Sequence, residues 1–118
     1  MFDKKRKFIK NIFSRENCIH TINSYIKELN IFRDRSLENM IIVDNSIFSF
    51  CTNINNGIYI QPFKGDKYDS ELEILAPFLE ELVEEKDVRL KIKSTFKNSY
   101  ILKKYSAITK QPCSNNLI

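Results

Sequence analysis

The sequence predicts an α/β domain with a parallel sheet that is short of strands. The first indication is a run of four large apolar residues at 40–43, which ends in the polar stretch 44–46. Such a run is typical of a strand buried on both faces of a parallel sheet. A second short apolar run at 58–60 and an amphipathic helix pattern at 70–83 follow. Alternating strands and helices indicate an α/β domain, but two or three strands seldom form a stable parallel sheet.

Local patterns predict the other elements in order. Residues 8–13, which follow a basic stretch, predict a short strand, and residues 25–31 space apolar side chains as in two turns of helix. Residues 53–57 are rich in asparagine and end in glycine, which predicts a turn before the strand at 58–60. Residues 111–116 lack periodicity, and we expect a loose tail there.

The clearest helix pattern begins near Ser70. Ser70 and Glu73 have the spacing of a capping box, and Asp69 is an alternative cap. Leucines and a valine form one apolar stripe at positions 72, 75, 79, 82 and 83. Pro77 lies inside this pattern, and because the stripe continues beyond it we expect a bend and not an end.

The next segment, 87–92, allows two interpretations. Its strict alternation of polar and apolar residues predicts a strand. Alternatively, Asp87 caps a helix that carries Val88, Ile92 and Phe96 on one side.

Size and composition exclude several classes of protein. The chain has 118 residues, enough for one domain or part of one, and no apolar run approaches the ~20 residues that span a bilayer. No apolar stretch follows the basic N-terminus, so we expect neither secretion nor a membrane segment. Three widely spaced cysteines and a single histidine argue against a zinc site and favour a reducing, intracellular compartment.

The net charge of +4 is concentrated at 4–10 and 91–104. Basic clusters of this size are more often solvated faces than nucleic-acid sites, and we do not expect nucleic acid as a partner. A basic surface also suits a phosphorylated partner.

The polar stretch after the first buried strand is the candidate site. Ligands of open α/β sheets bind outside the carboxyl ends of the strands, where Asp44 and Asn45 would lie. Carboxylate and amide oxygens suit a hard cation such as Mg²⁺. Alternatively, Asp44, Asn45 and Ser46 are turn residues that end a strand.

A set of short motifs extends along most of the chain. They lie at 14–18, 25–29, 41–46, 56–58, 62–63, 65–66, 69–72, 75–79 and 87–89. In this order and spacing they resemble the catalytic domain of the RNA polymerase II C-terminal-domain phosphatases, also called NLI-interacting-factor-like phosphatases, of the haloacid dehalogenase superfamily. The resemblance implies an incomplete Rossmann-like haloacid dehalogenase fold at 1–93, whose parallel sheet lacks its first central strand. Residues 94–118 would form a basic extension and a loose tail.

The resemblance also implies residue roles. Lys27 matches the lysine that neutralises phosphate charge and holds the catalytic aspartate, and Asp44 and Asn45 match the pair that positions Mg²⁺. Arg15 matches an arginine near the phosphopeptide groove. A lysine and a divalent ion would stabilise the charge that spreads over the phosphoryl oxygens during transfer. Alternatively, Lys27 is a solvated helix lysine and Arg15 a surface charge paired with Glu16.

One departure from the family pattern decides the expected activity. Family members carry Asp-x-Asp-x-Thr after their first strand, with the first aspartate as nucleophile and the second as general acid and base. The 118 residues contain no Asp-x-Asp pair. We therefore expect a truncated or divergent Mg²⁺-dependent protein serine/threonine phosphatase that is inactive alone and binds Mg²⁺ weakly.

Other functions remain open. One is a non-catalytic module of the same fold that binds a phosphopeptide or a protein, and another is an unrelated basic binding domain. The expected partner is a protein or peptide carrying phosphoserine or phosphothreonine, in the nucleus or the cytoplasm. The family that the chain resembles consists of phosphoric monoester hydrolases, but the chain lacks their nucleophile.

Overall fold

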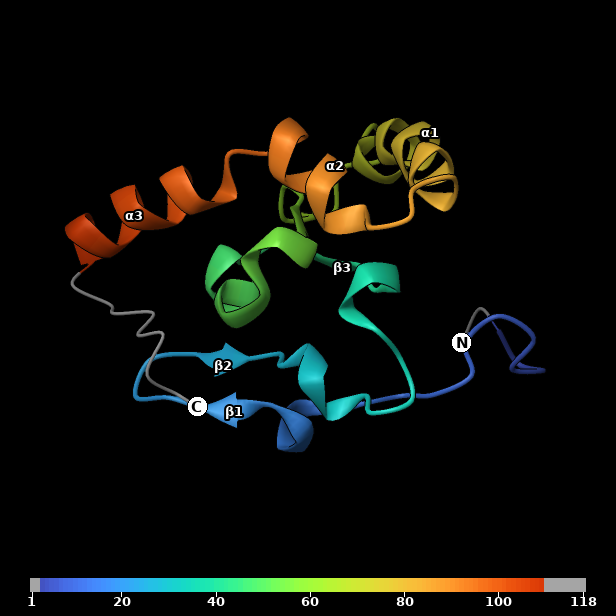
Figure 1. Ribbon diagram of the computed structural model, residues 1–118, viewed down its shortest axis with the longest axis horizontal. Coiled ribbons are helices and arrows are strands. Elements are labelled where there is room, and N and C mark those ends of the chain that lie inside the picture. Colours follow the sequence, from blue (N-terminus) through green and yellow to red (C-terminus); the bar gives the residue numbers. More distant parts are fainter. Residues whose placement is uncertain (1–2, 110–118) are drawn as a thin grey trace.

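The computed structural model describes residues 3–109 and shows a mixed α/β arrangement (Figure 1). In chain order the elements are η1 (Arg15–Asn17), β1 (Ile19–His20), β2 (Tyr25–Ile26), η2 (Leu29–Ile31), η3 (Leu37–Asn39), β3 (Ile42–Asp44), η4 (Ile47–Asn56), β4 (Gly57–Tyr59), α1 (Glu71–Val83), α2 (Val88–Thr95) and α3 (Asn98–Thr109), where η denotes a 3-10 helix. The β1–β2 hairpin lies on one side of β3, and α1 and α2 lie on the other (Figure 1).

The parallel sheet is confirmed, and it consists of β3 and β4. Ile42 pairs with Gly57 and Asp44 pairs with Tyr59. Gly57 is required by close approach, because a Cβ at this position would collide with the ring of the fully buried Phe50. This small parallel sheet is consistent with a partial haloacid dehalogenase-like fold.

The expectation that the first buried strand is covered on both faces is wrong. Met40 is buried, but Ile41 and Val43 are each 36% exposed. Within residues 3–109, β3 pairs with β4 alone, so its other edge is open. The apolar run therefore has the composition of a central strand and the position of an edge strand.

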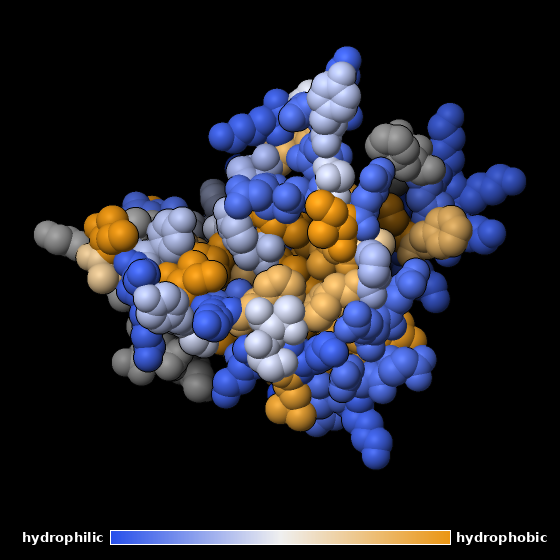
Figure 2. All heavy atoms as spheres, turned by 90° about the horizontal axis from the view of Figure 1, so that it is seen from above, coloured by the Kyte–Doolittle hydropathy of each residue, from blue (hydrophilic) through white to orange (hydrophobic). Residues whose placement is uncertain are grey.

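Helices α1 and α2 pack against β4 and enclose the main core. This core consists of Ile58, Leu75, Leu82, Val88 and Ile92, with Ile60, Phe78, Leu79 and Phe96 packed against it. The helix expected at 70–83 is confirmed as α1, which contains Pro77 without ending there. Seen from the helical side, hydrophobic residues lie between hydrophilic ones on the surface (Figure 2).

The helix caps decide two of the open alternatives. The Ser70 side chain makes no capping bond, so the capping-box expectation is wrong, and Asp69 Oδ1 accepts from the N–H of Glu71 at 3.0 Å instead. At α2, Asp87 Oδ1 accepts from the N–H of Arg89 at 3.0 Å. The helix interpretation of 87–92 is therefore confirmed, and the strand interpretation is wrong.

Two expectations for the N-terminal half are also wrong. Residues 8–13 form no strand, and Phe8 is 78% exposed. The preceding turn is held by Asp3, whose carboxylate accepts the backbone N–H groups of Lys7, Phe8 and Ile9. These three bonds lower the pKa of Asp3, that from Ile9 most. Residues 25–31 form β2 and η2 and not one helix.

Buried asparagines connect distant parts of the chain to η4. Asn56 Nδ2 donates to the carbonyl oxygens of Leu37 at 2.6 Å and Met40 at 2.8 Å, which fixes the approach to β3. Asn98 Nδ2 donates to the carbonyl oxygens of Ile54 and Gly57, which fixes the start of α3.

Helix α3 was not predicted from the sequence, although it lies in the expected extension 94–118. The loose tail expected at 111–116 lies outside the described residues. Among the described helices, none combines the length and the apolar character that crossing a bilayer requires.

Candidate functional site

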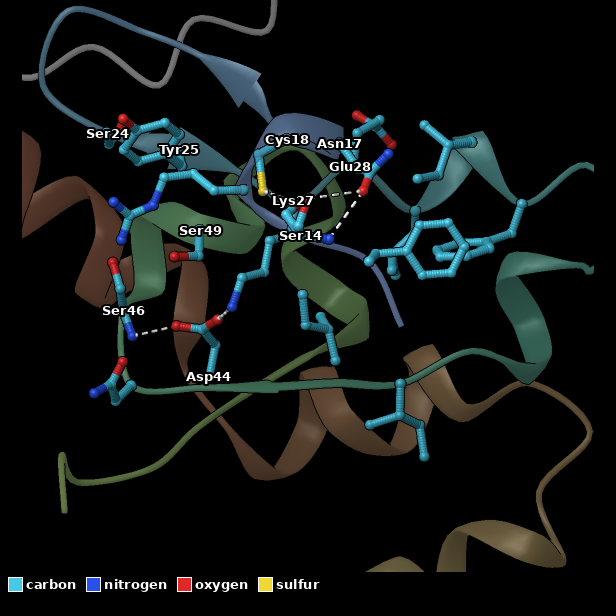
Figure 3. Close-up of a pocket in the computed structure, with 18 of the residues that line it drawn as sticks. Ser14, Asn17, Cys18, Ser24, Tyr25, Lys27, Glu28, Asp44, Ser46 and Ser49 are labelled. Carbon is cyan, nitrogen blue, oxygen red and sulfur yellow. Dashed lines mark hydrogen bonds and ion pairs between the residues drawn. The ribbon is translucent and has the colours of Figure 1, made fainter. Parts of the chain in front are cut away.

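The candidate site is built around an ion pair between Lys27 and Asp44. Lys27 follows β2 directly and Asp44 ends β3. The two residues are seventeen positions apart in sequence, and their side chains meet here. Figure 3 shows the Lys27 side chain reaching across to the Asp44 carboxylate. The Asp44 side chain is 5% exposed, whereas that of Lys27 is 52% exposed. Because Lys27 lies outside the helices and is paired with Asp44, it is not the solvated helix lysine of the alternative interpretation.

Backbone contacts hold both partners of this pair in place. The N–H of Lys27 donates to the carbonyl oxygen of Ser49 in η4 at 2.6 Å. Asp44 Oδ1 accepts from the N–H of Ser46 at 2.8 Å, and its Oδ2 accepts from Lys27 Nζ. Both oxygens of the Asp44 carboxylate thus already have a protein partner.

The donor set fits part of a magnesium coordination sphere. Asp44 offers a carboxylate and the exposed Asn45 an amide oxygen, both at the carboxyl end of β3. Mg²⁺ is commonly held by one or two carboxylates and keeps several water molecules. Among residues 3–109, no group of three or more His, Cys, Asp or Glu side chains is arranged to hold a metal ion.

A cavity of about 810 Å³ opens beside the ion pair. It brings together all four residues singled out from the sequence, Arg15, Lys27, Asp44 and Asn45. The Arg15 guanidinium lies 4.8 Å from the centroid of the Tyr25 ring, so a cation–π contact orients it.

The polar wall of this cavity carries hydroxyl groups as well as cations. The side chains of Ser24, Ser46 and Ser49 line it (Figure 3). Apart from Asp44, the one acid in the lining is Glu28, whose carboxylate already accepts from the backbone and side-chain nitrogens of Asn30. Two cations with several hydroxyl groups can bind an anion with several oxygens.

The other wall of the cavity is apolar and lies next to the open edge of β3. It is lined by Phe13, Leu29, Phe32, Ile41 and Ile42. The rings of Phe13 and Phe32 contact each other edge to face, with centroids 4.9 Å apart. The cavity therefore combines a polar end at the ion pair with an apolar end along the strand.

A second cavity, of about 340 Å³, is also bordered by the ion pair. Besides Lys27, Asp44 and Asn45 it is lined by Asp69 and Glu71 and by several uncharged residues. Sequence reasoning assigned no site role to these two acids, although both lie in the motif at 69–72. The hydroxyl of Ser49 was missed because nothing local in its sequence indicates a cavity.

Comparisons with known proteins find a family model and several relatives that match most of the chain. The family model described as NLI interacting factor-like phosphatase matches residues 1–89. The chain is 39% identical over 97 residues to CTD small phosphatase-like protein 2 of Dictyostelium discoideum, covering 82% of this chain and 17% of that protein. It is 36% identical over 88 residues to the human CTD small phosphatase-like protein, covering 75% of this chain and 31% of the relative.

A third relative is a nuclear envelope morphology protein. The chain is 33% identical over 91 residues to nuclear envelope morphology protein 1 of Saccharomyces cerevisiae, covering 70% of this chain and 20% of that protein. The chain thus spans between 17% and 31% of the length of these three relatives.

Proposed function

Because the chain belongs to the NLI interacting factor-like phosphatase family, we propose that it forms the C-terminal part of a Mg²⁺-dependent protein serine/threonine phosphatase domain. The observation that carries this proposal is the Lys27–Asp44 ion pair, which lies at the end of β3 and borders a cavity that also contains Arg15. Residues 1–93 are the proposed phosphatase part, and 94–118 a basic extension.

Each site residue has a proposed role. Asp44 and Asn45 hold Mg²⁺, which when bound stabilises negative charge on the phosphoryl oxygens. Lys27 places its ammonium against the phosphate and against the nucleophilic carboxylate. Arg15, oriented by the ring of Tyr25, binds the phosphorylated peptide beside the reacting group.

The chain alone is proposed to be inactive. An aspartyl-phosphate intermediate forms by attack of a carboxylate on phosphorus, and the 118 residues contain no Asp-x-Asp pair to supply it. Lys27, Asp44 and Asn45 can then bind and orient a phosphate group, but no Asp-x-Asp carboxylate is present to form the bond to phosphorus.

We propose that a strand outside these residues carries the nucleophile and pairs with the open edge of β3. The exposure of Ile41 and Val43 and the apolar end of the cavity support this position. The carboxyl end of such a parallel strand would lie at the same edge of the sheet as Asp44.

A non-catalytic phosphopeptide or protein-interaction module is the second candidate. It is favoured by the cavity wall, where Arg15, Lys27 and hydroxyl groups are present independently of any nucleophile. The proposed partner in either case is a protein or peptide carrying phosphoserine or phosphothreonine, located in the nucleus or the cytoplasm.

Hydrolysis of p-nitrophenyl phosphate with Mg²⁺ tests the proposal. We expect no turnover above the buffer rate from residues 1–118, and turnover from a polypeptide extended upstream by a strand with the Asp-x-Asp-x-Thr motif. Turnover by residues 1–118 alone contradicts the proposed inactivity. If the extended polypeptide is also inactive but residues 1–118 bind a phosphoserine peptide more tightly than its unphosphorylated form, the second candidate is the correct one.

A further inference from the structure

The Lys27–Asp44 ion pair separates two cavities of opposite character. Apart from the pair itself, the larger one contains the cation Arg15, several hydroxyl groups and the acid Glu28, which is bonded to Asn30, whereas the smaller one contains the acids Asp69 and Glu71. Both cavities are bordered by Lys27 and Asp44. The smaller cavity is therefore the more negative of the two and suits a cation, whereas Arg15 and the hydroxyl groups of the larger cavity can bind an anion.

The two partners of the pair differ in their freedom to move. Asp44 is buried, and the N–H of Ser46 fixes one of its oxygens. Lys27 is fixed at its backbone by the carbonyl oxygen of Ser49, but half of its side chain is exposed. A lysine has a flexible four-carbon stem and three donors, so its ammonium can exchange partners while its backbone stays in place.

We propose that Lys27 is an exchangeable counter-ion which couples anion binding in the larger cavity to divalent-cation binding at Asp44. With Lys27 on Asp44, a divalent cation meets a neutralised carboxylate and a nearby positive charge. An anion with phosphate-like oxygens in the larger cavity attracts the ammonium and frees Asp44 Oδ2 for the cation. Each ligand thereby tightens the binding of the other. The inference rests on the proposed function, in which Asp44 and Asn45 hold the cation.

The test measures binding of Mn²⁺ to the 118-residue chain by electron paramagnetic resonance, with and without inorganic phosphate. A protein-free titration corrects for complexes between the two ions. We expect phosphate to tighten Mn²⁺ binding about tenfold, within the usual range of coupling between two sites. Because coupling is reciprocal, Mn²⁺ must tighten phosphate binding by the same factor.

Substitution of the lysine separates this exchange from direct contact between the two ions. Lys27→Met should bind Mn²⁺ about tenfold more tightly than wild type without phosphate, because a cation beside the carboxylate is removed. Phosphate should then have little further effect. Lys91→Met is the matched control: it also removes one positive charge and one ion pair, with Glu81, but should bind Mn²⁺ like wild type.

The remaining outcomes identify which proposal fails. If Lys27→Met binds Mn²⁺ no more tightly than wild type, or keeps the full phosphate effect, the exchange is refuted. If Asp44→Asn binds Mn²⁺ as wild type does, the cation lies elsewhere and the proposed role of Asp44 fails instead. If Lys27→Met does not fold, the effect of phosphate on Mn²⁺ binding by the wild type decides. If phosphate does not tighten that binding, the exchange is refuted.

Discussion

Asn56 is the residue whose loss should disturb the base of β3 most directly. Asn56 is 2% exposed, and its side chain donates to two carbonyl oxygens, those of Leu37 and Met40. Asn56→Ala leaves both acceptors without this donor. An unsatisfied buried polar group costs about 1–3 kcal/mol, and because the Leu37 carbonyl is only partly buried we expect a total loss of about 2–4 kcal/mol.

The consequence can be measured as a melting temperature. For a domain of this size about 1 kcal/mol corresponds to roughly 4 °C, so Asn56→Ala should melt about 8–16 °C below wild type. Asn56→Asp should be at least as harmful at neutral pH, because a carboxylate would face two carbonyl oxygens, and should recover partly on acidification.

Asn55→Ala provides the matched control for this experiment. The half-buried Asn55 side chain makes no hydrogen bond within residues 3–109, and its removal should cost less than about 0.5 kcal/mol. Thermal melts followed by circular dichroism give the comparison. If Asn56→Ala and Asn55→Ala melt within about 2 °C of each other, Asn56 does not hold the approach to β3, and the reasoning is refuted.

Three further predictions concern other parts of the fold. Gly57→Ala should cost about 1–3 kcal/mol in chemical denaturation because its Cβ would collide with a buried ring, and unchanged stability would contradict that packing. Asp69→Ala should destabilise the protein by about 0.5–2 kcal/mol and Ser70→Ala by clearly less, because Asp69 accepts the first N–H of α1; equal losses would contradict this cap. The hydrogen bond from Arg89 lowers the pKa of Asp87, so the carboxylate stabilises the fold above its unfolded-state pKa and loses this effect as the pH falls through the lowered value. Wild type should therefore be more stable to unfolding than Asp87→Asn at neutral pH, by a margin that shrinks on acidification. A margin that does not change with pH would contradict this stabilising role of the Asp87 carboxylate.

Helices whose apolar stripe or capping residue lies within the helix's own segment could be predicted from the sequence. The apolar stripe of α1 continues through Pro77 to the buried Leu82, although Leu72 and Val83 at the ends of the predicted stripe are exposed. Asp87 caps α2, as one of the two interpretations of 87–92 required. The helix expected at 25–31 failed because tertiary bonds outweigh its spacing: the N–H of Lys27 bonds to Ser49, and that of Leu29 bonds to Asn53 Oδ1 at 3.0 Å. Local periodicity contains no information about such partners.

The unpaired edge of β3 explains why the apolar run at 40–43 is more exposed than the sequence predicted. The run before Asp44 has the composition of a central strand, but Val43 is partly exposed because β3 has no second neighbour among the described residues. Asp44 and Asn45 were indicated by their position after the apolar run. Lys27 was indicated only by the family resemblance, since seventeen residues separate it from Asp44. The adjoining cavity, with Ser49 in its wall, required the fold.

The central claim is that Lys27 and Asp44 form one electrostatic unit at the end of β3. A double-mutant cycle of unfolding free energies with Lys27→Met, Asp44→Asn and the double variant tests it directly. Breaking a buried pair costs about 3–5 kcal/mol, but half of the Lys27 side chain is exposed, so we predict a coupling energy of about 1–2 kcal/mol. A coupling energy indistinguishable from zero would contradict the account.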